Sequence, residues 1–205
     1  MIMKKRHMAC LLYILMGIAE YANANSTIQA LANCDASFFK EIQNDGNLKS
    51  LIPSLDISML KTTGKLSFPT TFTSPEGIEV NSFIVTYTDF DKYKEISTFD
   101  VKGQFYYWGF ESLQSFNEIV KILSQKINLV KIGNIYTYNP MIRNTVDGQW
   151  MANNSAVDGV APEENSAEKL FIIEDNKEKG VVSIMCTLQG EITDKDLYLT
   201  GLLKK

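Results

Sequence analysis

Gly103 to Ile127, GQFYYWGFESLQSFNEIVKILSQKI, is the densest apolar segment after the N-terminus, and it decides the predicted fold. Its first part is aromatic, which is typical of a pleated strand. Side chains alternate along a strand, so two sets form: Phe105 and Tyr107 on one face, and Tyr106, Trp108 and Phe110 on the other. Because both faces are aromatic, we expect a central strand that is covered on each side.

The second part of this segment changes to a helical period. Its apolar residues recur every three or four positions, which places them on one stripe of an amphipathic helix: Phe116, Ile119, Val120, Leu123 and Ile127. Ser115 stands three residues before Glu118, which is the spacing of a capping box, and Ser112 is an alternative cap one turn earlier. The pattern therefore predicts a helix near 113–127 that packs on the preceding strand.

The N-terminus has the features of a secretory signal peptide. Lys4, Lys5 and Arg6 precede an apolar run at 8–19, which is too short to span a bilayer, and a small-x-small site ends at Ala24. Cys10 lies before most of the apolar run, which is the wrong place for a lipoprotein cysteine. We expect a signal peptide over residues 1–24 and a soluble periplasmic or secreted protein; a retained anchor is the alternative.

The net charge of the chain limits the kinds of partner that it is expected to bind. The formal net charge is −4, and the expected leader holds three basic residues and one acidic residue, so its removal leaves a more acidic chain. This balance disfavours nucleic acid and anionic membranes as partners. No later apolar run is long enough for a transmembrane helix.

Two cysteines, Cys34 and Cys186, remain after the expected cleavage. An even number in an exported chain predicts a disulfide bond, which here would join the first helical region to a late strand. The sequence has no C-x-x-C motif, so we expect a structural bridge and not a redox centre.

The order of the elements predicts the architecture. A helix is expected around Phe38 and Ile42, ending at 44–46, and further helical turns are expected at 48–59, interrupted at Pro53. Strands are expected near 65–73, 79–90, 103–110, 128–138, 169–174 and 180–188, with a final edge strand at 197–202. We predict a single α+β domain over 25–205, with an antiparallel sheet and helices packed on one face. The order also allows two half-repeats, 34–110 and 111–205.

The sequence lacks the residues that most common catalytic mechanisms require. The only histidine, His7, belongs to the expected leader, which excludes Ser-His-Asp catalysis, Cys-His catalysis and histidine-ligated zinc in the mature chain. The D-x-D pairs at 89–91 and 194–196 are interpreted as solvated turns, with a calcium ion as the alternative. A carboxylate pair for glycoside hydrolysis stays open, although nothing marks one. We therefore expect no enzyme activity, no cofactor and no metal.

The polar segment 141–168 follows Asn139-Pro140, which is expected to end a strand. Structureless connections of this length are usually functional or disordered. It begins near Arg143, the sole arginine after the leader, and contains Trp150. Tryptophan and arginine often anchor interfaces; the alternative is that Trp150 fills a local pocket and Arg143 is solvated.

The predicted function is an exported, non-catalytic module that binds another exported or envelope protein, of an inhibitor or immunity type. The candidate contact residues are Tyr106, Trp108, Arg143 and Trp150, since tyrosine and tryptophan combine apolar bodies with polar tips. The alternative is a carrier that holds an apolar small molecule on the aromatic face of the sheet. An enclosed pocket around Tyr106 and Trp108 would favour the carrier, and a flat exposed patch would favour the protein partner.

Overall fold

The computed structural model describes residues 26–52, 63–93, 102–156 and 163–203. The expected signal peptide and the helical turns beyond Pro53 lie outside these residues. The described strands are β1 (Gly64–Thr73), β2 (Glu79–Asp89), β3 (Gln104–Ser112), β4 (Val130–Ile132), β5 (Ile135–Arg143), β6 (Met151–Ala152), β7 (Ala167–Asn176) and β8 (Val181–Gly190). The described helices are α1 (Thr27–Ala32), α2 (Ser37–Asn44), α3 (Gly46–Leu51), α4 (Phe116–Leu123) and α5 (Asp194–Thr200), with a short 3₁₀ turn η1 (Phe90–Tyr93).

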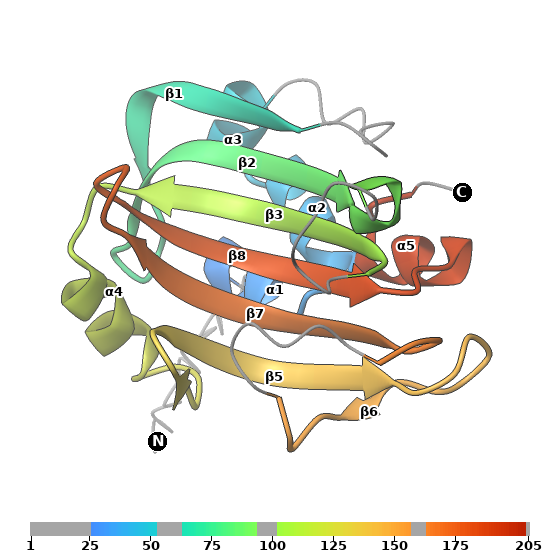
Figure 1. Cartoon of the computed structure of the whole chain (residues 1–205). Coiled ribbons are helices and arrows are strands. Elements are labelled where there is room, and N and C mark those ends of the chain that lie inside the picture. Colours follow the sequence, from blue (N-terminus) through green and yellow to red (C-terminus); the bar gives the residue numbers. More distant parts are fainter. Residues whose placement is uncertain (1–25, 53–62, 94–101, 157–162, 204–205) are drawn as a thin grey trace, which may run out of the picture.

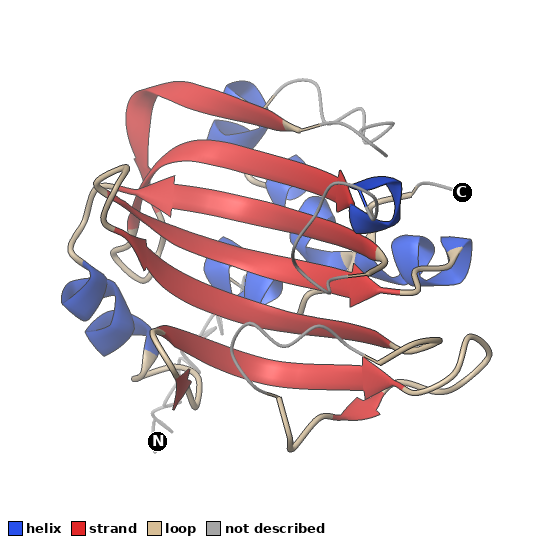
Figure 2. Ribbon diagram, viewed as in Figure 1, coloured by secondary structure: helices blue, strands red, loops and turns tan. Residues whose placement is uncertain are grey.

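The strands form one antiparallel sheet, in the order β1-β2-β3-β8-β7-β5-β4, with β6 beside β5 (Figure 1). Helices α1, α2 and α3 lie behind the sheet in Figure 2, α5 lies beyond the end of β8, and α4 lies near the end of β3. Buried residues of all five helices join the larger apolar cluster on this side, which we call the helix face. The predicted α+β fold with helices packed on one face of an antiparallel sheet is confirmed.

The aromatic strand β3 lies near the middle of this sheet, between β2 and β8. Tyr106, Trp108 and Phe110 belong to the large cluster on the helix face, while Tyr107 packs with a smaller cluster on the opposite face. The predicted alternation of two aromatic faces is therefore confirmed. The small cluster is built from strand residues: Ile135, Leu170, Ile172 and Met185, with Ile84, Tyr107 and Ile132 packed against it.

The N-terminal helices are attached to the sheet by a covalent link. The sulfur atoms of Cys34 and Cys186 lie 1.97 Å apart, and their Cα atoms lie 5.5 Å apart, as in a disulfide bond. Cys34 lies between α1 and α2, and Cys186 lies on β8 facing Phe171 of β7 and Trp108 of β3. Both cysteines are buried, so the link runs through the core.

Helix α4 has the predicted Ser115 cap but is shorter than the helix expected near 113–127. Ser115 is the N-cap, and its side chain accepts a hydrogen bond from the backbone N–H of Glu118. Ile119 and Leu123 are buried on the helix face, and the ring of Phe116 lies 5.8 Å from that of Tyr136 on β5. The helical stripe thus docks α4 on the second half of the sheet.

Three predictions of secondary structure were wrong. The strand expected at 128–138 is a hairpin of β4 and β5, because Gly133, with φ of +55°, reverses the chain. Pro140 does not end β5; the pairing with β7 shifts register between Tyr138 and Met141 and then continues. The segment expected as an edge strand at 197–202 belongs mostly to α5, which begins with a capping box between Thr193 and Asp196.

The last strands of the two predicted half-repeats, β3 and β8, are neighbours in the sheet and run antiparallel. Each follows a pair of antiparallel strands that extends outward from it, β1 and β2 on one side and β5 and β7 on the other. The division into half-repeats stays a prediction, since this arrangement concerns element order alone.

Candidate partner-binding surface

Tyr106 and Trp108 do not present a surface to a partner. Tyr106 is 3% exposed and Trp108 is 0% exposed, because both point from β3 into the core beneath the helices. Burial raises the pKa of the Tyr106 phenol, whose ring centroid lies 4.8 Å from that of Tyr87 with the two rings tilted. The expectation of an exposed aromatic face around these two residues is therefore wrong, since both side chains are buried in the cluster that contains the helix residues.

Arg143 is also internal, at 1% exposure. Its Nη2 donates to Asp196 Oδ2 at 3.0 Å and to the Glu191 carbonyl at 2.6 Å, and its Nη1 donates to the Thr145 carbonyl. A buried guanidinium requires an opposite charge and hydrogen-bond acceptors, and this position supplies both. A solvated arginine, which was the alternative to an interface anchor, does not fit this environment, and the buried side chain has no exposed surface for a partner.

Trp150 completes a compact group around the same carboxylate. Its Nε1 donates to Asp196 Oδ1 at 3.2 Å, and its ring lies 5.8 Å from the guanidinium carbon of Arg143 and 5.7 Å from Lys169 Nζ. Lys169 Nζ donates to the Cys34 carbonyl at 3.4 Å, and burial lowers its pKa. We call Arg143, Trp150, Lys169 and Asp196 the Asp196 clamp. It joins the segment after β5 to α5 and to the backbone of Cys34. A contact between Trp150 and a partner stays a prediction.

A groove at the end of β3 is a better candidate for contact with a partner. It encloses about 260 Å³ and lies where β1, β2, β3 and the start of β8 meet. We call it the Glu111 groove. Its lining residues are Lys65, Ser67, Phe68, Asn81, Ser82, Glu111, Ser112, Leu113 and Val181. None of these residues is among the contacts predicted from the sequence.

The groove has an ionic pair among its lining residues. The Glu111 side chain is 7% exposed and accepts a hydrogen bond from Ser82 Oγ at 3.0 Å, on Oε2. Lys65 Nζ lies 2.5 Å from the same oxygen, but the Lys65 side chain is 50% exposed. The pair therefore joins a buried anion to a half-exposed cation.

The rim of the groove carries Leu113, which is 70% exposed, the largest value among the exposed large apolar side chains of the described residues. Its backbone N–H donates to Asn81 Oδ1 at 3.2 Å. On either side of it, the Ser112 hydroxyl donates to the Glu79 carbonyl, and Gln114 Oε1 accepts from the Glu79 N–H. The loop from β3 to α4 is thus fixed to β2, and it holds an apolar side chain outward.

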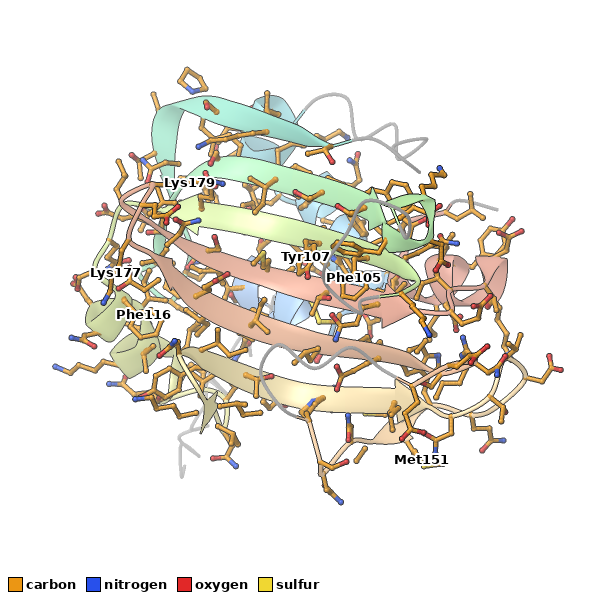
Figure 3. The ribbon with its side chains drawn as sticks, viewed as in Figure 1. Phe105, Tyr107, Phe116, Met151, Lys177 and Lys179 are labelled. Carbon is orange, nitrogen blue, oxygen red and sulfur yellow. A yellow bond between two sulfur atoms is a disulfide. The ribbon has the colours of Figure 1, made fainter. Side chains whose placement is uncertain are left out.

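A second carboxylate lies on the same sheet face, away from the groove. Glu168 accepts hydrogen bonds from Asn153 Nδ2 at 2.6 Å and from Gln189 Nε2 at 2.7 Å, and burial raises its pKa. Figure 3 shows Phe105 and Tyr107 on this face, with Lys177 and Lys179 at the tip of the β7–β8 hairpin. Each carboxylate oxygen of Glu168 thus accepts a hydrogen bond from an amide side chain.

Within the described ranges, no three metal-ligating side chains gather at one place. None of the helices in those ranges has the length and apolar character that crossing a membrane requires. No family model matches the chain, and no curated protein or solved structure matches it either.

Proposed function

We propose that this chain is an exported, non-catalytic protein-binding module, of an inhibitor or immunity type, and that its partner contacts the Glu111 groove. The observation that carries the proposal is Leu113, a leucine held outward at the rim of a groove by hydrogen bonds between its loop and β2. Rigid apolar side chains beside pockets are typical anchors of interfaces, because binding them costs little conformational entropy.

The dimensions of the groove favour a protein partner over the alternative, a carrier of an apolar small molecule. Ligand sites usually enclose about 300–1,000 Å³ and are mainly apolar. The Glu111 groove, at about 260 Å³, is smaller and contains an ion pair. It suits one or two side chains of a larger molecule better than a whole apolar ligand.

Two further features support the class of partner and the compartment. The chain is acidic, with a formal net charge of −4, so a basic partner would be attracted over a distance. The bonded pair Cys34–Cys186 is compatible with an oxidising, exported location. Export predicts an intact mass that corresponds to a chain beginning at Asn25.

Affinity capture from an envelope extract of the native host tests the proposal. The bait is the exported protein, beside Leu113→Asp and the control Val130→Asp, which places the same charge on exposed β4 at the opposite edge of the sheet. We expect the wild type and the control to retain the same partner and Leu113→Asp to lose it, with similar thermal melts for all three. Equal capture by Leu113→Asp would place the interface elsewhere.

A further inference from the structure

Glu111 is a nearly buried anion that depends on a cation. Burying a carboxylate is costly unless it is paired and hydrogen-bonded. The Ser82 hydroxyl supplies one hydrogen bond, and the charge partner is Lys65 from the edge strand β1. The groove thus contains a site for a positive charge, and Lys65 of the edge strand β1 occupies this site.

Lys65 is a replaceable occupant of that site. Half of its side chain is exposed, and ion pairs that involve an exposed lysine contribute little to stability because solvent and side-chain entropy compete with them. Its Nζ contacts Oε2 of Glu111 as a single point charge. A guanidinium can bond both oxygens of one carboxylate in a planar pair, which is stronger and more specific.

The surroundings suit an arginine side chain. Phe68, Leu113 and Val181 supply apolar lining against which the methylene stem of an arginine can pack. The nearby segment 174–180 at the hairpin tip carries three acidic and two basic residues, so its charges do not oppose an incoming cation.

We propose that the Glu111 groove receives an arginine side chain of the bound protein, which displaces Lys65 from Glu111 while the partner packs on Leu113. This inference rests on the proposed function and adds the chemistry of the partner: a basic protein that presents an exposed arginine beside an apolar residue. Lys65 then acts as an internal competitor that keeps Glu111 neutralised in the free protein.

The experiment uses N-acetyl-arginine amide as a probe and N-acetyl-citrulline amide, which has the same shape without the charge, as its control. Each is titrated into the isotope-labelled protein while the backbone amide signals of Ser112 and Leu113 are followed. The variants are Glu111→Gln, Lys65→Met and Glu168→Gln. The last is the matched control, since it neutralises another buried carboxylate on the same sheet face.

We expect saturable shifts with arginine and none with citrulline. Binding should weaken roughly tenfold or more in Glu111→Gln, since hydrogen bonds to a charged group are lost. It should be unchanged in Glu168→Gln and tighter in Lys65→Met, where the competitor is absent. Absence of binding by wild type, equal binding of citrulline, unchanged binding in Glu111→Gln, or weaker binding in Lys65→Met would each overturn the inference.

Affinity capture with the same variants tests the arginine site and the proposed function separately. Capture that is lost with Leu113→Asp but is unaffected by Glu111→Gln and Lys65→Met leaves the protein-binding function in place and overturns the arginine site. Capture that survives Leu113→Asp overturns the proposed interface itself, and the arginine site as a partner contact fails with it.

Discussion

Trp150 Nε1 donates a hydrogen bond to Asp196 Oδ1 across 3.2 Å, and this bond ties the segment after β5 to the first turn of α5. The same carboxylate pairs with Arg143 through its other oxygen. One aspartate therefore bonds two residues of types that often anchor interfaces, a buried arginine and a partly buried tryptophan.

Trp150→Ala should lower the free energy of unfolding by about 2–3 kcal/mol, because it removes a partly buried ring and leaves Asp196 Oδ1 without its donor. Chemical denaturation measures the change. The control Met151→Ala alters an exposed neighbour and should stay within about 0.5 kcal/mol of wild type. If Trp150→Ala is as stable as the wild type, the ring does not stabilise the attachment of the segment after β5 to α5.

Asp196→Asn should destabilise the protein by about 3 kcal/mol, since it leaves the Arg143 guanidinium buried without its counter-charge. Asp194→Asn, an exposed change in the same helical turn, removes only an interaction with the helix dipole and should cost less than about 1 kcal/mol. Urea melts of the two variants compare them directly. Equal losses would mean that the ion pair adds nothing beyond the effect of the helix terminus.

The raised pKa of Glu168 predicts a pH dependence of stability. Burial favours the protonated form in the folded state, so the folded chain binds more protons than the unfolded chain above the unfolded value of 4.5. The contribution is fully present below that value and is lost as pH rises through the folded pKa. Glu168→Gln should remove it, so the stability of the variant relative to wild type should rise with pH from about 4.5 upward. Denaturation curves at several pH values measure the difference, and parallel profiles would contradict the prediction.

Cys34 and Cys186 should give no free thiol signal when the folded protein is denatured without reductant, because the two residues are bonded. Loop-entropy reasoning for a link across 152 residues gives a contribution of about 5 kcal/mol, with smaller values common in practice. Cys34→Ser with Cys186→Ser, or reduction of the wild type, should therefore lower the melting temperature strongly. Two thiols per chain in a thiol titration would show that the bond is absent.

Much of this fold follows from local patterns in the sequence. The alternation in β3, the helical stripe and Ser115 cap of α4, and the cysteine pair each carry a strong signal, and the structure agrees with them. The misses come from turn chemistry and capping. Gly133 reverses the chain inside a segment whose alternation predicts one strand. The Thr193–Asp196 capping box starts a helix in a segment whose apolar residues at 197, 199 and 202 also fit a strand.

The candidate site was less predictable, because the type of a residue does not reveal whether its side chain is buried or exposed. Trp108 and Tyr106 alternate with Tyr107, and the sequence does not say which face the helices cover. Arg143 is internal because Asp196, far away in sequence, lies beside it. Leu113 had a usable signal, since an apolar residue stands between a strand and the serine that caps the next helix.

The pairing of β3 with β8 has a consequence for the way the chain folds in a cell. Gln104 lies opposite Gly190 and Ser112 opposite Val182, so the strand that fills the middle of the sheet is the last one to be synthesised. Until β8 arrives, β3 and β7 both present unpaired edges, which are prone to aggregation. Non-local pairings of this kind also form slowly. The residues up to Gly190 must therefore be available before β3 and β7 are joined through β8 and the sheet can close.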